Sequence, residues 1–237
     1  MRPNEAKGLM AFWADFDDEH IAEIQKWHNC EHMIERVSIP GFIVGRRYRG
    51  IDDAPTFLFT YETTETAVLK SAPYLRALNN STPWTQKALT YYKNNMRNIY
   101  SLLASGGKCA PTEAPYVYVV RFNLAADIEN DTVAWIKDIY LPEIAALSRS
   151  YRCRFYQIDE KISNIMTGER SIYGGGPGQQ KYLFMFELAQ QHLPEEWQQI
   201  NAQHRRMIAH LSDQCVEFSY LDFVLYAPEI DSLRRDQ

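Results

Sequence analysis

The two halves of the chain repeat one pattern, and this repeat limits the fold more than any other feature of the sequence. Trp27 and Tyr48 lie 21 positions apart in the first half, and Trp135 and Tyr156 lie 21 positions apart in the second. The 237 residues are enough for two units of about 110 residues each. We therefore predict an internal duplication, in which two similar units fold from one chain.

The order of the predicted elements supports this duplication. In the first half, apolar strand-like runs at 8–16, 42–48, 56–62 and 95–103 alternate with helical stretches at 18–37 and 84–92. In the second half, strands at 116–123, 151–157, 181–187 and 216–226 alternate with helices at 131–148 and 194–212. Each half thus has the βαββαβ order of a ferredoxin-like unit. We place the first unit at 1–105, a linker rich in glycine and small residues at 106–114, and the second unit at 115–237.

A four-stranded sheet that carries both helices on one face leaves its other face bare, and that face must be covered. We therefore predict an α+β fold in which the two tandem ferredoxin-like units pack sheet to sheet as an intrachain α+β barrel. Aromatic residues make up 13% of the chain. A barrel lined with so many aromatic side chains is expected to enclose a cavity for a small molecule.

Composition and charge argue against several classes of protein. The formal net charge is -5, so the chain lacks the positive field with which proteins bind nucleic acid. No run of about 18 apolar residues occurs, which argues against a membrane span. The four cysteines, at 30, 109, 153 and 215, form no CxxC pair, and such scattered cysteines are typical of reduced thiols. We predict a cytoplasmic protein.

The densest polar cluster lies in the first predicted helix. His28 and His32 are four residues apart and share one helix face, with Glu31 or Glu35 beside them. Histidine titrates near neutral pH, and a neighbouring carboxylate can orient it and raise its basicity. One interpretation makes His32 a general acid/base that faces the cavity, with Glu31 or Glu35 setting its tautomer and His28 alongside. The other interpretation is a solvated helix face without chemistry.

The same residues match H-x-x-E-H, a motif of zinc proteases. Two histidines at this spacing can bind zinc, but the motif needs a third ligand from a downstream helix. The available carboxylates, Glu62, Glu65 and Glu113, fall at a strand end or in loops. We predict no metal site.

Candidates for substrate binding lie mostly on the predicted strands. Arg46 and Arg47 are adjacent, so they point to opposite faces and only one of them can enter the cavity. That arginine either holds a substrate carboxylate or enolate through paired hydrogen bonds or serves as a salt-bridge partner. Aromatic side chains could line a pocket for a flat substrate, although strand aromatics are also ordinary core. The candidate set is Arg46, Arg47, Tyr48, Tyr61, Trp13, Trp84 and Tyr140.

The second half lacks the ionisable trio of the first. In the gapless alignment, the residues opposite His28, Glu31 and His32 are Ile136, Ile139 and Tyr140. Our hypothesis is that the first half keeps the chemical groups while the second supplies an apolar wall and closes the barrel. The alternative is drift between two copies that are both non-catalytic.

A long connection at 158–180 separates two strands of the second half and carries the run GGGPG at 174–178. The run lacks the GK[ST] of a phosphate-binding loop. The connection is therefore either a mobile lid or a plain surface loop.

The first half also resembles a known family. The pattern W-x-x-x-E-H-x-x-E-R at 27–36, followed by I-P-G-F at 39–42 and an Arg-Arg-Tyr strand, is similar to the EthD-like branch of the dimeric α+β barrel superfamily. The resemblance covers residues 8–103 and extends to the second half mainly through the order of elements. It implies the barrel fold and places His32 in a pocket. Relatives include isomerases, cyclases, dehydratases, cofactor-independent monooxygenases and haem-handling enzymes.

The favoured expectation is a small-molecule enzyme of the lyase or isomerase type. It would move protons on a hydrophobic oxygenated or aromatic substrate, with His32 as acid/base and no cofactor. The alternatives are a cofactor-free or haem-dependent monooxygenase and a small-ligand-binding protein without catalysis. The expected partner is a small-molecule substrate, and a homodimer is left open.

Overall fold

Eight antiparallel strands form one closed barrel in the order β1-β3-β2-β8-β5-β7-β6-β4. The structure, a computed structural model, describes residues 6–227. The strands are β1 (Gly8–Asp15), β2 (Phe42–Gly50), β3 (Phe57–Thr63), β4 (Lys93–Gly106), β5 (Tyr116–Asn123), β6 (Ser150–Ile158), β7 (Tyr182–Leu188) and β8 (Ser212–Tyr226). The predicted α+β class and the packing of two ferredoxin-like sheets into an intrachain barrel are confirmed.

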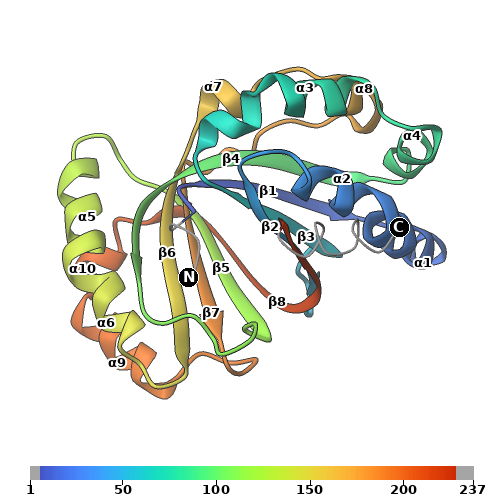
Figure 1. The fold of residues 1–237 in the computed structure, drawn as a ribbon. Coiled ribbons are helices and arrows are strands. Elements are labelled where there is room, and N and C mark those ends of the chain that lie inside the picture. Colours follow the sequence, from blue (N-terminus) through green and yellow to red (C-terminus); the bar gives the residue numbers. More distant parts are fainter. Residues whose placement is uncertain (1–5, 228–237) are drawn as a thin grey trace.

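The helices form two layers on opposite sides of the barrel, one layer for each half (Figure 1). The first layer contains α1 (Asp18–Trp27), the π-helical turn η1 (His28–His32), α2 (Met33–Val37), the 3₁₀ turn η2 (Thr66–Lys70), α3 (Ala72–Asn79) and α4 (Pro83–Leu89). The second contains α5 (Glu129–Trp135), the π-helical turn η3 (Ile136–Tyr140), α6 (Leu141–Ala145), α9 (Glu195–Gln203) and α10 (Arg205–Ile208). Within residues 6–227, no helix is long and apolar enough to cross a membrane.

The two longest strands close the barrel. The first part of β4 pairs with β1 and its last part pairs with β6 of the other half. In the same way, β8 pairs first with β5 and then with β2. Each of these strands therefore spans both sheets, which explains why they have 14 and 15 residues. The prediction ended the fourth strand at 103, whereas β4 continues into the predicted linker as far as Gly106.

The middle of the barrel is filled with side chains. Along β1, Leu9, Ala11 and Trp13 point inward, whereas Met10 and Phe12 point outward to the first helix layer. The other buried members of this inner cluster are Tyr48, Leu58, Tyr100, Val117, Val119, Tyr156, Leu183 and Met185. The expected hollow between the two sheets, open to His32, is therefore wrong. A helix lies on the outer face of its sheet, so a side chain that leaves it toward the sheet cannot reach the barrel interior.

The duplication is visible in a rare local feature. The backbone N–H of Met33 donates to the carbonyl of His28, and the N–H of Leu141 donates to that of Ile136. Both bonds span five residues, so each helix widens into one π-helical turn. The two turns start 108 positions apart, the same offset that relates Trp27 to Trp135. The aligned sequences thus form the same irregular helix twice.

The long connection of the second half forms two short helices, α7 (Glu160–Ser163) and α8 (Gly168–Tyr173). Both lie over the first half (Figure 1): α8 contacts α3 and α4, and α7 contacts β4 and η2. The glycine run returns the chain along β4, where Gly176 forms a bridge with Met96. Gly175 has a φ of +69°, and a Cβ there would lie 2.1 Å from Oδ1 of Asn95. Of the two alternatives, a plain surface loop is excluded, because α8 covers the first helix layer.

Candidate functional site

The predicted histidines lie in a closed space between the first helix layer and the outer face of its sheet. The walls come from β1, β3, β4, the helices α2 to α4, and α8 of the other half. The remaining free volume is about 30 Å³, enough for one or two water molecules. We call this space the histidine cavity; it is lined by Met10, Phe12, His28, His32, Arg36, Phe59, Tyr61, Tyr74, Leu78, Leu89, Tyr92, Arg97, Glu169 and Tyr173.

The π-helical turn directs both imidazoles toward the sheet. The ring centroids of His28 and His32 are 5.8 Å apart, and the side chains are 1% and 9% exposed. The interpretation of these residues as a solvated helix face is therefore wrong. A π-helical turn inside an α-helix is often found at functional sites.

The tautomer of His28 follows from its two neighbours. Nη1 of Arg47 lies 3.1 Å from Nδ1 of His28, and the hydroxyl of Tyr61 lies 3.0 Å from Nε2. A guanidinium can only donate, so Nδ1 must accept and Nε2 must carry the proton. Nε2–H then donates to the Tyr61 oxygen, which leaves the Tyr61 hydroxyl hydrogen for an acceptor in the cavity. Burial, and after it the charges of Arg47 and Arg36, hold the pKa of His28 well below its usual range.

His32 is a buried imidazole with an unused nitrogen. Its Nδ1 has no hydrogen-bond partner among the described residues. Burial, followed by the charge of Arg36 and the neighbouring His28, lowers the pKa of His32 well below 6.5. His32 is therefore neutral at pH 7 and has a nitrogen that can exchange a proton with a ligand.

Two arginines give the cavity a positive charge. Arg36 forms an ion pair with Glu169 of α8, and both side chains are almost fully buried. Nη2 of Arg97 donates to the hydroxyl of Tyr74 at 3.1 Å. Arg36 is paired with two carboxylates, Glu169 and Glu35, whereas Arg97 forms no ion pair among the described residues. The buried guanidinium of Arg97, which has no carboxylate partner there, favours a ligand that is, or becomes, an anion.

The predicted contact between Glu31 and His32 is absent. The Glu31 carboxylate accepts hydrogen bonds from the hydroxyls of Thr82 and Thr85, at 2.6 and 2.8 Å. Glu31 therefore ties η1 to the start of α4 instead of orienting His32. Glu35 lies 3.1 Å from Arg36 and also has no contact with His32 among the described residues.

The structure divides the predicted substrate-binding residues among several places. Arg47 and Tyr61 contact His28 in the first helix layer. Arg46, Tyr48 and Trp13 point into the barrel. Arg46 and Arg47 face opposite sides of β2, as predicted. Arg46 points into the barrel, whereas Arg47 points to the first helix layer.

The remaining two aromatic candidates lie outside the histidine cavity. Trp84 is at the edge of the first helix layer, where its Nε1 donates to Glu23 at 2.9 Å. Tyr140 belongs to the second helix layer, and its hydroxyl donates to Asn201 at 2.9 Å. Tyr140 packs with Trp135 and Phe184 in the apolar core of that layer. This packing supports the hypothesis that the second half supplies apolar structure.

Several residues of the cavity were missed by the sequence analysis. Arg97 lies between Met96 and Asn98 in the polar first part of β4, so nothing in the sequence indicated that it is buried. Arg36 was part of the quoted motif but was given no role. Glu169 and Tyr173 carried no signal, because nothing local shows that α8 crosses over to the other half.

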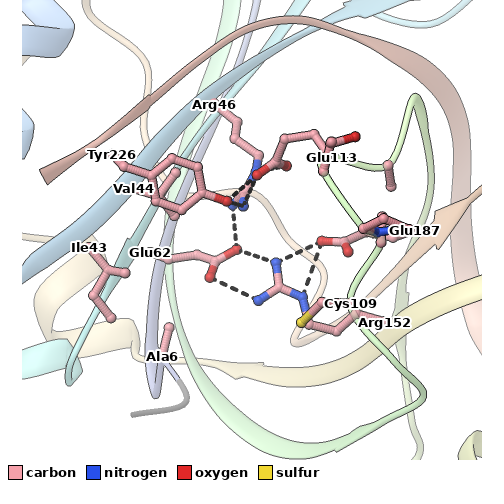
Figure 2. A pocket seen from close by; sticks show the side chains of 14 residues that line it. Ala6, Ile43, Val44, Arg46, Glu62, Cys109, Glu113, Arg152, Glu187 and Tyr226 are labelled. Atoms are coloured by element: carbon pink, nitrogen blue, oxygen red, sulfur yellow. Dashed lines mark hydrogen bonds and ion pairs between the residues drawn. The ribbon is translucent and has the colours of Figure 1, made fainter. Parts of the chain in front are cut away.

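A second, larger cavity opens at one mouth of the barrel (Figure 2). Its volume is about 390 Å³, within the range of small-molecule sites. Arg46, Arg152, Glu62 and Glu187 form its floor, and the linker residues 109–114 form one wall. No residue of the predicted catalytic trio lines it.

We tested whether the histidine cavity fits a metal or a haem. Within residues 6–227, no three His, Cys, Asp or Glu side chains come together as a metal site. A haem is many times larger than the 30 Å³ beside His32, and both nitrogens of His28 are engaged. In the closed form the residues of the histidine cavity leave no room for a haem.

Comparison with known proteins gives the fold. The sequence matches no protein-family model, and it matches no curated protein. A structure of an anthrone oxidase-like protein aligns with a TM-score of 0.64 at 7% identity and covers 95% of both chains. A proposed monooxygenase from Lactobacillus acidophilus aligns with a TM-score of 0.59 at 7% identity, covering 94% of this chain and 97% of its own.

The imidazole complex of chlorite dismutase from Candidatus Nitrospira defluvii aligns with a TM-score of 0.55 at 11% identity, covering 97% of this chain and 96% of its own. This chain has the dimeric α+β barrel fold. At such low identities the likeness concerns the fold alone.

Proposed function

We propose that this protein is a cofactor-free oxygenase or oxidase that acts on a phenolic or enolisable aromatic compound in the histidine cavity. The observation that carries the proposal is the buried, neutral His32, whose Nδ1 has no partner among the described residues and which lines an aromatic cavity together with the unpaired Arg97. Proteins of this fold include one described as anthrone oxidase-like and proposed monooxygenases.

His32 limits the class of substrate. A lowered pKa makes His32 a weak base, so it can remove only a fairly acidic proton. Phenols and carbons flanked by carbonyl or aromatic groups supply such protons. The positive charges of Arg36 and Arg97 favour the resulting anion, and the Tyr61 hydroxyl can donate to its oxygen.

The proposed reaction balances with dioxygen as the co-reactant. Nδ1 of His32 takes a proton from a methylene carbon, and the carbanion gives electrons to dioxygen. One oxygen atom ends as a carbonyl on that carbon, and the other leaves as water with the two hydrogens of the methylene group. The substrate supplies all four electrons, so no external reductant is required.

Access to the cavity requires movement of α8. Tyr173 packs against Phe12 and Tyr92, with ring centroids 5.0 and 6.1 Å away. Glu169 holds α8 to Arg36. Since about 30 Å³ is free in the closed form, an aromatic substrate must displace these side chains. We propose that residues 168–173 act as the cover that opens.

Proton transfer without oxygen is the second candidate. The same base and oxyanion donors would serve a lyase or isomerase, because both reactions begin with the same abstraction. This candidate rests on the geometry around His32 and needs no argument from the fold.

The EthD-like branch remains our proposal for the first half, on the W-x-x-x-E-H-x-x-E-R pattern. All four cysteines are free, which supports the proposed cytoplasmic location.

The experiment is oxygen uptake with anthrone and a panel of phenols and 1,3-diketones. We expect uptake that falls by about 10²–10⁴-fold in His32→Ala and is unchanged in His192→Ala, an exposed histidine outside the cavity. Exchange of the acidic C–H with deuterium under nitrogen measures the abstraction separately. Exchange without oxygen uptake would favour the lyase or isomerase. No substrate exchange and no uptake with any compound of the panel would contradict both candidates.

A further inference from the structure

The cavity at the barrel mouth contains a carboxylate held in an arginine fork. Nε of Arg46 donates to Oε2 of Glu113 at 2.8 Å, and Nη2 donates to Oε1 at 3.1 Å. The Tyr226 hydroxyl donates to the same carboxylate. Figure 2 shows Glu113 reaching from the linker onto Arg46 beside Tyr226. A planar guanidinium that binds both oxygens of a carboxylate is a strong and geometrically specific pair.

Arg46 is held by the barrel as well as by the linker. It is 4% exposed, and its Nη1 donates to Oε1 of Glu62 at 2.7 Å. Glu62 also accepts from Arg152 and Arg154. A buried ionic cluster of the barrel therefore contacts Arg46 independently of Glu113.

The charges of the ionic cluster balance only when Glu113 is included. The groups in contact around the cavity floor are three arginines and three glutamates: Arg46, Arg152, Arg154, Glu62, Glu113 and Glu187. Without Glu113 the arginines would exceed the glutamates by one. Its side chain is also the most exposed of the three carboxylates, 20% against 5% and 7%. Glu113 is therefore the anion that can leave at the smallest cost.

The rest of the cavity is mostly apolar. Ile43 and Val44 line one side, and Ala110 and Pro111 of the linker line another. About 390 Å³ is free beside the fork. A ligand that replaced the Glu113 carboxylate would find room and an apolar surface for its body.

We propose that the barrel mouth binds a small monocarboxylate with an apolar body, and that Glu113 occupies the carboxylate position in its absence. The exchange replaces one carboxylate by another in the same fork and returns Glu113 to water. Because Glu113 is tethered beside the fork, it competes at a high effective concentration and weakens binding in the wild type. This site is separate from the histidine cavity and does not depend on the proposed function.

The test uses hexanoate, with hexan-1-ol and hexylamine as probes of the same length. Calorimetric titrations compare the wild type with Glu113→Gln and with Glu196→Gln, a matched change at an exposed glutamate on α9. We expect hexanoate to bind Glu113→Gln at least tenfold more tightly than the wild type or Glu196→Gln. Adding Arg46→Lys to Glu113→Gln should weaken binding at least tenfold, because lysine cannot form the fork.

Equal affinity in Glu113→Gln and the wild type, or tighter binding of hexylamine than of hexanoate, would overturn the proposal. A second measurement covers the case in which Glu113→Gln fails to fold. Saturating hexanoate, but not hexan-1-ol, should raise the thermal midpoint of the wild type and speed amide exchange in linker residues 107–114. An unchanged midpoint and unchanged exchange would also overturn it.

Discussion

Nη1 of Arg47, on β2, lies 3.1 Å from Nδ1 of His28, in the turn that follows α1. This contact joins the second strand to the first helix through two buried side chains. Because arginine has no acceptor, it determines which imidazole nitrogen carries the proton. The strand therefore sets the tautomer of His28.

The first prediction concerns this tautomer. Nitrogen NMR of the wild type should show His28 as the Nε2–H form. In Arg47→Met, where a positive neighbour is lost, the pKa of His28 should rise toward, but remain below, its ordinary 6.5, because burial is the largest cause of the lowering. Arg49→Met, on the same face of the same strand, should leave the tautomer unchanged. Protonated Nδ1 in the neutral wild type would contradict the assignment.

The second prediction concerns stability against pH. His32 is neutral in the folded protein, whereas in the unfolded chain it binds a proton below about 6.5. Below that pH the unfolded state holds more protons, so the free energy of unfolding falls as pH falls. The loss is about 1.4 kcal/mol per pH unit for each such histidine, until the pH reaches the folded pKa.

Urea unfolding at pH 7, 6 and 5 measures this slope. His32→Leu should reduce the loss between pH 6 and 5 by about 1.4 kcal/mol, whereas His192→Leu, at an exposed position, should not change it. An unchanged slope in His32→Leu would mean that His32 titrates normally in the folded protein.

The third prediction concerns the ion pair that holds α8. Glu169→Gln removes the negative partner of Arg36 while keeping the shape of the side chain. We expect a loss of about 3 kcal/mol, at the low end for a broken buried pair, because Glu35 stays 3.1 Å from Arg36. Chemical denaturation measures it, with Glu160→Gln on the exposed side of α7 as the control. A loss equal to that of the control would show that Arg36 does not depend on Glu169.

The fourth prediction compares two neighbouring glycines. Gly174 has φ +68° and ψ -152°, a conformation almost restricted to glycine, and a Cβ there would meet nothing within 4 Å. Gly174→Ala should therefore cost about 1–3 kcal/mol from backbone strain alone.

Gly175→Ala should cost more, since its Cβ would also lie 2.1 Å from Oδ1 of Asn95 and 2.8 Å from the Asn95 carbonyl oxygen. It should also increase amide exchange in α8, because the run that fastens α8 to β4 is displaced. Thermal unfolding and exchange measurements check this order. Equal losses for the two variants would mean that contact with β4 is unimportant.

The barrel fold was predictable because the sequence pattern that produces it occurs twice along the chain. The βαββαβ order appears twice, and each sheet has one face that its own helices do not cover. The matched offset also predicted that Trp27 and Trp135 hold equivalent positions, and each directly precedes a π-helical turn in the structure. Even the opposite orientations of Arg46 and Arg47 follow from the alternation of a strand.

The histidine cavity was predictable only in part. The spacing of His28 and His32 indicated a shared face, but not which surface that face would meet. Glu31 stands beside His32 in the sequence and yet contacts Thr82 and Thr85. Side-chain partners of this kind depend on the direction in which α4 approaches, and no local pattern encodes that direction.

The amino-acid sequence alone determined the duplicated α+β architecture and the presence of an ionisable cluster in one copy only, since periodicity and element order are local properties. The tertiary structure decided that these histidines face the outside of the sheet, that α8 of the other half covers them, and that Arg46 belongs to a separate cavity. These relations join residues far apart in the sequence: Arg36 and Glu169 are 133 positions apart, and Arg46 and Tyr226 are 180 apart. They arise only when packing brings distant segments into contact.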